Sequence, residues 1–360
     1  MGRVTLQTIA DRVGVSRMTV SNAFSRPDQL SDDLRTRVLA AADDLGYVGP
    51  DPAARALARG STGAVGILLK DSLTEAFSDW VATTFLASVA DHLSSSGLAL
   101  TLLTPGGTHE IVPARDVAMD GVLVYVCGPE SQDVTWLKRR RLPMVGIDQD
   151  PLAGVAHVNV DDRTGARAAA QHLLDLGHRR IAILTIGSDD PQAIAPGAAV
   201  EPYGHAGQQR MLGWTDALDT AGVTPTIALA PFRPPDAAYD SARQLLQLKD
   251  RPTAVLCFSD VYASQVVRAA RDLGLDVPSD LSVVGYDDSP LATQLQPQLT
   301  TVRQDIQGKA HAAVGLLTAV LKARHDGTEE PADHLLLPVE LVVRATTGPP
   351  PRSKARAKAS

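Results

Sequence analysis

Between residues 64 and 347, short apolar runs alternate with longer segments in which apolar residues recur every three or four positions. The first pattern is typical of buried strands and the second of amphipathic helices. This alternation predicts parallel sheets with helices on both faces, and places any ligand outside the carboxyl ends of the strands. The predicted strands include VGILL, LALTLL, GVLVYVC, PMVGI, RIAILT, AVLCF and LSVVGY, and the predicted helices cover residues 80–95, 161–176, 207–221, 238–248, 260–273 and 305–324.

The first 46 residues carry only the helical pattern. Thr5 is a suitable N-cap for a first helix, and Gly14 ends it because glycine adopts positive φ without strain. Ser16 then caps a second helix over residues 17–24, and Ser31 caps a third that ends at Gly46. The apolar stripes are Leu6, Ile9, Ala10 and Val13 in the first helix, Val20 and Phe24 in the second, and Leu34, Val38, Ala41 and Leu45 in the third.

Two short helices separated by Gly14-Val15-Ser16, with a third helix behind them, form the helix-turn-helix pattern. The outer face of the second helix is small and polar, so it can enter a major groove about 12 Å wide and reach base edges. The alternative is a three-helix bundle without a ligand. That alternative is less favoured because the outer face lacks the long Glu and Lys pairs of a merely solvated helix.

The charge of the chain is unevenly distributed. Of the net −7 over 360 residues, residues 1–60 carry +1, the segment from residue 349 to 360 carries +4, and the rest carries −12. The interpretation as a DNA-binding head therefore rests on its motif and not on its charge. We find no secretory signal and no apolar stretch of the ~18–20 residues that span a bilayer, so we expect a cytoplasmic protein without a membrane partner.

Motifs that carry enzymatic chemistry are missing from the sequence. There is no GxGxxG, GxxxxGK[ST] or GxSxG, and residues such as His157 and His172 lack metal-ligand spacing. His178 is interpreted as a structural contact. Cys127 and Cys257 each end an apolar run, and we expect two buried thiols rather than a disulfide. The sequence thus predicts a protein that is not an enzyme and has no cofactor and no metal site.

The head and the segment after it, VTLQTIADRVGVSRMTVSNAF and LRTRVLAAADDLGYVGPDPAARALARG, resemble the lactose/galactose repressor (LacI/GalR) family of bacterial regulators. The resemblance implies that bases are read by Arg17, Met18 and Asn22, and that phosphates are contacted by Thr5, Ser16, Thr19 and Ser21. The family most often has Arg where this chain has Asn22, and Asn where it has Ser25. Since Asn favours adenine and Arg favours guanine, we expect a different operator base at that position.

Residues 50–61 follow the head as a short helix that Asp51 caps and Gly60 ends. Ala54 and Leu57 resemble the family's hinge helix, in which the leucine wedges into the minor groove. The alternative is a plain helical linker. Gly49 is an extra residue relative to the family pattern.

The rest of the chain resembles the family's effector domain, which has the two-lobed α/β fold of periplasmic sugar-binding proteins. The matching segments run from DDRTGARAAAQHLLDLGHRRIAILT to LTTVRQDIQGKAHAAVGLL. The implied boundaries are 1–49 for the head, 50–61 for the hinge and 62–347 for the effector and dimerisation domain. One lobe covers about 62–160 and 304–330, the other about 161–303 and 331–347, and 348–360 is a disordered basic tail.

Several polar residues match effector-binding positions of the family: Asp148, Arg210, Ser259 and Asp287. Phe77, Trp80 and Phe232 are candidate walls for a ring, with Trp80 equally suited to the core. Two alternatives stay open: Asp260 caps a helix or contacts the ligand, and Asp287 with Arg210 forms a structural ion pair. The Pro/Gly-rich stretch 187–207 is either a lid or a disordered insertion.

Together these features predict a homodimeric repressor that binds a near-palindromic double-stranded DNA operator. Its small-molecule effector is expected to be a carbohydrate or a related polar metabolite. A periplasmic transport receptor shares the fold but needs a signal peptide and no DNA-binding head, which is the reverse of this sequence.

Overall fold

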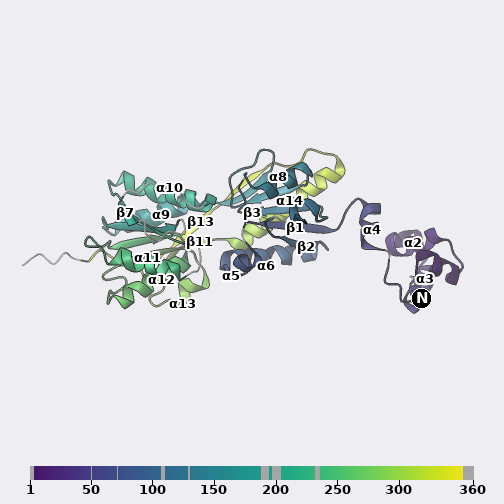
Figure 1. Ribbon diagram of the computed structural model, residues 1–360, viewed down its shortest axis with the longest axis horizontal. Coiled ribbons are helices and arrows are strands. Elements are labelled where there is room, and N and C mark those ends of the chain that lie inside the picture. Colours follow the sequence, from purple (N-terminus) through teal and green to yellow (C-terminus); the bar gives the residue numbers. More distant parts are fainter. Residues whose placement is uncertain are drawn as a thin grey trace, which may run out of the picture. The chain divides into compact units, whose positions relative to one another are not determined.

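The computed structural model describes residues 4–49, 51–70, 72–106, 110–128, 130–187, 194–196, 204–231 and 236–351 (Figure 1). The chain forms two compact units. The first contains residues 1–63 with 118–120, and the second contains the remainder. Within the described residues, no helix is long and apolar enough to cross a membrane.

The first unit contains the predicted helices. They are α1 (Leu6–Val13), α2 (Arg17–Ser25) and α3 (Asp32–Asp44), with a single 3-10 turn η1 (Pro27–Gln29) and a further helix α4 (Pro52–Arg59). Thr5, Ser16 and Ser31 each accept a hydrogen bond from a backbone N–H of the first turn, which confirms the three predicted caps. Gly14 has φ 76°, so it ends α1 in the left-handed conformation. The core consists of Ile9, Ala10, Val20, Ala23, Val38 and Ala42.

The second unit is built on two sheets. The six-stranded sheet has the order β12-β5-β4-β3-β1-β2 and is parallel throughout. The seven-stranded sheet has the order β13-β11-β10-β9-β6-β8-β7, in which only β13 and β7 are antiparallel to their neighbours. In chain order the strands are β1 (Ala64–Leu69), β2 (Ala99–Leu103), β3 (Gly121–Tyr125), β4 (Met144–Ile147), β5 (Ala156–Val160), β6 (Ile181–Ile186), β7 (Ile194–Pro196), β8 (Thr226–Ala230), β9 (Ala254–Cys257), β10 (Ser282–Asp287), β11 (Thr300–Gln304), β12 (His334–Leu337) and β13 (Val339–Val342).

Helices cover both faces of the seven-stranded sheet, as predicted. The helices α9 (Asp162–Asp175) and α10 (Gly204–Thr220) share one core with it. The helices α11 (Ala237–Leu246), α12 (Asp260–Asp272) and α13 (Pro290–Gln294) share the other. On the six-stranded sheet, α6 (Trp80–Ser95) and α14 (Ile306–Asp326) pack together in one core. The remaining short helices are α5 (Leu73–Ser78), α7 (Pro113–Asp116) and α8 (Gln132–Arg139).

The chain passes three times between the two lobes that these sheets define. It crosses after β5, again after β11, and finally between β12 and β13. The predicted boundary of the last crossing, residue 331, is wrong. Leu337 pairs with Val160 of the first lobe and Val339 pairs with Gln304 of the second, so the crossing lies at Pro338.

The C-terminal segment is anchored further than predicted. The N–H of Gly348 donates to Ser282 Oγ at 3.0 Å, and its carbonyl lies 2.8 Å from His178 Nε2. The expected disorder from residue 348 is therefore wrong for residues 348–351, and the predicted tail beyond them lies outside the described residues. His178 is buried and also bonds Thr253 Oγ1 at 2.8 Å, which confirms it as a structural contact.

Candidate functional site

The outer face of α2 carries the predicted base-reading residues. Arg17 is exposed, and the Met18 side chain is 71% exposed, so both are available to a ligand. Asn22 is half-buried, and its Nδ2 donates to Gln29 Oε1 at 3.1 Å. The Gln29 contact, which the sequence did not indicate, orients the Asn22 amide from the turn that follows α2.

Two of the four predicted phosphate contacts, Thr5 and Ser16, are helix caps. Thr5 forms a reciprocal capping box with Thr8, and the Ser16 and Thr19 hydroxyls lie 2.8 Å apart. Ser21 is half-buried on α2. Hydroxyls and backbone N–H groups at helix starts are the groups that hold phosphate oxygens in helix-turn-helix proteins.

The short helix α4 exposes its one large apolar side chain. Asp51 Oδ1 accepts hydrogen bonds from the N–H groups of Ala53 and Ala54, at 2.9 and 3.3 Å, and so caps the helix as predicted. Leu57 is 88% exposed. The exposed Leu57 therefore adds no tertiary packing to α4. A helix of only eight residues is marginal in water without such packing.

The segment after α4 is tied down by one carboxylate. Asp120 accepts hydrogen bonds from Ser61 Oγ, from the N–H and hydroxyl of Thr62, and from the N–H of Gly63, at 2.7–2.9 Å. Partial burial opposes ionisation of Asp120, but these donors outweigh it and hold its pKa below the usual value. Residues 61–63 thus have a defined anchor where the first unit ends.

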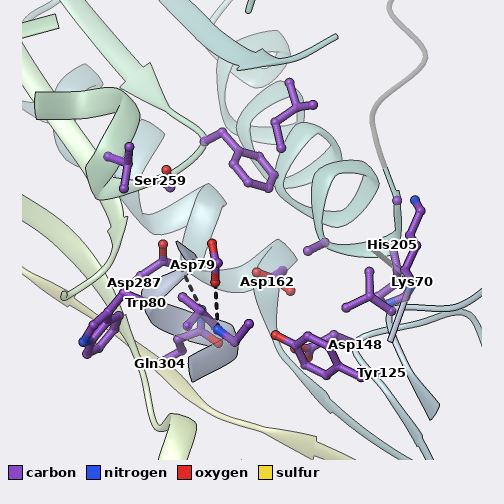
Figure 2. Close-up of a pocket in the computed structure, with 18 of the residues that line it drawn as sticks. Lys70, Asp79, Trp80, Tyr125, Asp148, Asp162, His205, Ser259, Asp287 and Gln304 are labelled. Carbon is purple, nitrogen blue, oxygen red and sulfur yellow. Dashed lines mark hydrogen bonds between the residues drawn. The ribbon is translucent and has the colours of Figure 1, made fainter. Parts of the chain in front are cut away.

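A cavity of about 370 Å³ lies between the two lobes of the second unit (Figure 2). It opens where the strands of both sheets end at their carboxyl termini, as the parallel topology predicts. Its size falls near the lower end of the range for small-molecule sites. Asp148 follows β4, Ser259 follows β9, and Asp287 ends β10, and all three line it together with Arg210 of α10.

The first lobe contributes Asp148, which is supported from beneath by a buried lysine. The Lys309 side chain is 0% exposed, and its ammonium donates to Asp148 Oδ2 and to Gln304 Oε1. Asp148 has φ 50°, an uncommon conformation for a residue with a side chain. Its second oxygen, Oδ1, has no hydrogen-bond partner among the described residues. A buried carboxylate oxygen without a donor is an acceptor ready for a ligand.

The second lobe contributes a buried arginine shared by two carboxylates. Arg210 Nε donates to Asp162 Oδ1 at 2.8 Å, and Nη2 lies 3.5 Å from Asp287 Oδ1. Arg210 Nη1 donates to the carbonyl of Phe258 at 2.5 Å, and the Tyr286 ring lies 3.6 Å from the guanidinium carbon. Arg210 and Asp287 are thus paired, as one alternative predicted, and both also line the cavity, so their role as effector contacts stays a prediction.

Carboxylates outnumber cations around this cavity. Burial raises the pKa of Asp162 despite Arg210, and burial raises the pKa of Asp287 well above its usual value, with Asp79 adding to the effect. Figure 2 shows Asp79, Asp162 and Asp287 in the same part of the cavity. The lining contains these three and Asp148, against Lys70 and Arg210, with Lys309 below. Oxygen acceptors on four acidic side chains suit a ligand that donates hydrogen bonds, while the raised pKa of Asp287 lowers the negative charge of the site.

Comparison with known proteins decides the family. A model described as "Bacterial regulatory proteins, lacI family" matches residues 5–49, and one described as "Periplasmic binding protein-like domain" matches residues 170–347. An HTH-type transcriptional regulator of Mycobacterium tuberculosis is 38% identical over 359 residues, which cover 97% of this chain and 98% of the relative. The chain belongs to the LacI family.

Two further relatives extend this result. The HTH-type transcriptional repressor PurR of Photobacterium profundum is 30% identical over 336 residues, covering 89% of this chain and 93% of the relative. The solved complex of the transcriptional regulator CelR with cellobiose is 28% identical, with a TM-score of 0.68 and coverage of 96% of this chain and all of that one. This LacI-family protein is therefore a DNA-binding transcriptional regulator with an effector-binding domain, and the family consists of regulators rather than enzymes.

Some predicted contacts of this LacI-family cavity need correction. Phe77 is 57% exposed and is not among the described residues that line the cavity, whereas the neighbouring Trp80 is. The reason is that the helix is interrupted: α5 ends at Ser78 and α6 starts at Trp80, so the two aromatic residues lie on different helices. Phe232 lies outside the described residues, as do residues 188–193 and 197–203 of the predicted lid or insertion.

Ser259, not Asp260, is the N-cap of α12. The Ser259 Oγ accepts a hydrogen bond from the N–H of Tyr262, and Ser259 also lines the cavity. Asp260 is fully buried and accepts from Ser289 N–H at 2.6 Å and from Thr301 Oγ1 at 2.5 Å. Burial raises its pKa to about 6. Both proposed roles of Asp260 are thus wrong, because it is a structural acceptor behind the cavity wall.

The sequence missed several residues of the site. Asp79 caps α6 through Ala82 N–H at 2.7 Å, and a capping aspartate before a Trp was a signal that could have revealed it. His205 of the second lobe contacts Asp150 of the first lobe, since its Nδ1 lies 2.7 Å from Asp150 Oδ1. Asp162 and Lys309 lie on helices and Gln304 lies at the end of β11, and none of the three belongs to a sequence motif that marks it. Among the described residues, no three His, Cys, Asp or Glu side chains are placed to hold a metal together.

Proposed function

We propose that this regulator is a homodimeric repressor whose effector is an uncharged, polyhydroxylated molecule of the sugar class, bound between the lobes. The observation that carries the effector class is the unpartnered Asp148 Oδ1 in a cavity with surplus carboxylates. Hydroxyl groups donate to such oxygens, whereas an ionised ligand phosphate or carboxylate has no hydrogen to donate. The CelR relative, solved with cellobiose, supports this class, and the PurR relative, named a repressor, supports the direction of control.

On the DNA side, each protomer reads one half of a near-palindromic operator, which requires two heads related by a two-fold axis. Arg17, Met18 and Asn22 read bases from α2. Ala54 and Leu57 of α4 enter the minor groove between the half-sites, where Leu57 unstacks a base step. The exposure of Met18 and Leu57 supports these roles, since both side chains lack a folded partner in the first unit.

The effector class is tested with a thermal-shift panel on the full chain. Neutral sugars (ribose, glucose, cellobiose and maltose) are compared with glucuronate and glucose 6-phosphate. A binder present at 100 times its Kd stabilises the folded state by about 2.7 kcal/mol, which raises the melting temperature by about 5 °C or more. Stabilisation by an anionic member alone would refute the proposed class.

The site is tested with Arg210→Ala. Arg163→Ala is the matched control, because Arg163 is exposed and pairs with Asp216 on the outside of the same lobe. The duplex is selected from a random library by the full chain, and anisotropy reports its release. Arg210→Ala is expected to abolish the effector response and to leave operator affinity near that of the control. Loss of effector response and DNA binding together would contradict the assignment, and a monomer in light scattering would contradict the homodimer.

A further inference from the structure

Two histidines from distant parts of the chain meet on the first lobe. His92 lies on α6 and His311 on α14, 219 residues apart, and these helices pack against each other in one core. His92 Nε2 lies 2.5 Å from His311 Nδ1. His311 is exposed and His92 is half-buried, so the pair is open to solvent and lies outside the effector cavity.

The hydrogen bonds of His92 determine which of its nitrogens carries the hydrogen. His92 Nδ1 lies 2.8 Å from the carbonyl oxygen of Ser88, one turn earlier on α6. A carbonyl only accepts, so Nδ1 carries the hydrogen and Nε2 presents its lone pair to His311. An imidazole that donates one N–H to a backbone carbonyl and turns the other nitrogen outward has the arrangement of a metal-ligating histidine.

The spacing of the two rings fits one coordination geometry. Their centroids lie 4.5 Å apart and their planes are inclined at 85°. With metal–nitrogen bonds of about 2.0–2.1 Å and about 1.1 Å from nitrogen to ring centre, two cis imidazoles at 90° have centres about 4.5 Å apart, and at the tetrahedral angle about 5.2 Å. The ring centres therefore need not separate, but His92 Nε2 and His311 Nδ1, now 2.5 Å apart, must move to about 2.9 Å as the rings turn into cis positions of the square-planar or octahedral coordination that Cu²⁺ and Ni²⁺ adopt.

We propose that His92 and His311 form a bidentate binding site for a divalent transition metal of the Cu²⁺ or Ni²⁺ type, with water in the remaining positions. Within the described residues no third His, Cys, Asp or Glu completes a cluster. The site is thus an exchangeable one rather than a structural centre. A bound ion cross-links two helices that also serve the cavity, since α6 begins with Trp80 and α14 carries Lys309 two residues before His311.

The test uses the full chain without a polyhistidine tag, titrated with NiCl₂ in a calorimeter. The wild type is expected to bind one Ni²⁺ per chain at this site, and His92→Ala and His311→Ala are each expected to weaken it at least ~10-fold. His325→Ala is the matched control, because His325 is exposed on the same helix, and it should bind as the wild type does.

A second measurement identifies the ligands directly. With one equivalent of Cu²⁺, electron paramagnetic resonance should show two imidazole nitrogens in the wild type and one in His311→Ala. Circular dichroism verifies that His92→Ala, His311→Ala and His325→Ala are each folded. Absence of Ni²⁺ binding in the wild type overturns the proposal. Undiminished Ni²⁺ affinity in both His92→Ala and His311→Ala overturns it equally.

Discussion

The buried ion pair beneath the cavity permits a quantitative prediction. Lys309→Met replaces the ammonium with an apolar group of similar length and leaves the Asp148 carboxylate without the cation that pairs with it. Removal of one partner of a buried ion pair typically costs about 3–5 kcal/mol, because the remaining charge is left uncompensated. Asp148 lines the cavity and its side chain is 11% exposed, so we expect the lower end, about 3 kcal/mol.

Thermal unfolding followed by circular dichroism measures this cost. A loss of about 3 kcal/mol corresponds to a fall in melting temperature of about 6–12 °C for a domain of 150–250 residues, and to somewhat less for a larger one. Lys322→Met is the matched control, since Lys322 is exposed on the same helix. It should stay within about 0.5 kcal/mol of the wild type.

The double variant separates charge from packing. Lys309→Met with Asp148→Asn contains neither charge, and we expect it to be more stable than Lys309→Met alone, because the orphaned carboxylate is gone. The two single substitutions should therefore not add. A melting temperature of Lys309→Met within 2 °C of the wild type would refute the reasoning, as would strict additivity in the double-mutant cycle.

Three other outcomes follow from single residues. The pKa of Asp260 is about 6 in the folded chain against 3.8 unfolded, so the folded state holds the proton more tightly. The contribution of Asp260 to stability therefore falls by about 3 kcal/mol as the pH rises from about 4 to 6. Asp260→Asn should lack this fall in a pH series of urea unfolding curves, and parallel curves would contradict it. Leu57→Ala should lower operator affinity at least ~10-fold while non-specific binding changes little, as filter binding at fixed salt would report, and equal losses would exclude the wedge. Gly14→Ala should destabilise the head by about 1 kcal/mol, because a side chain is strained at a φ of 76°. Nothing lies within 4 Å of an added Cβ, so this backbone strain is the whole cost and no clash adds to it. An unchanged melting curve would exclude strain at that turn.

The sequence predicted what is decided locally. Thr5, Ser16 and Ser31 cap their helices because the side chain bonds its own first turn, whatever packs around it. Asp148 and Asp287 stand at strand ends of two different sheets, so their placement in one site came from the family resemblance and not from strand direction alone. Family resemblance supplied Arg210 within a helix, where no local pattern marks it.

Tertiary contacts decided the remainder. The strand β5 was missed because AHVNV contains polar residues, yet all five are buried between β4 and β12. The strand β12 was assigned to the wrong lobe, since its pairing with β5 depends on a partner some 175 residues earlier. Lys309 has the appearance of a solvent-facing lysine in an amphipathic pattern, and only the fold brings Asp148 to it.

The missed residues are the ones that set the charge of the cavity. Asp148 and Asp287 alone suggest an acidic site, and Arg210 suggests one able to hold a ligand carboxylate. In the structure, however, Asp162 and Asp287 already share Arg210, and Lys309 is committed to Asp148. Arg210 and Lys309 are thus already paired with carboxylates, and Lys70 also lines the cavity. The proposed preference for a hydroxylated effector therefore rests on acceptor side chains that carry no motif, and on their pairing, rather than on the residues that the sequence marks.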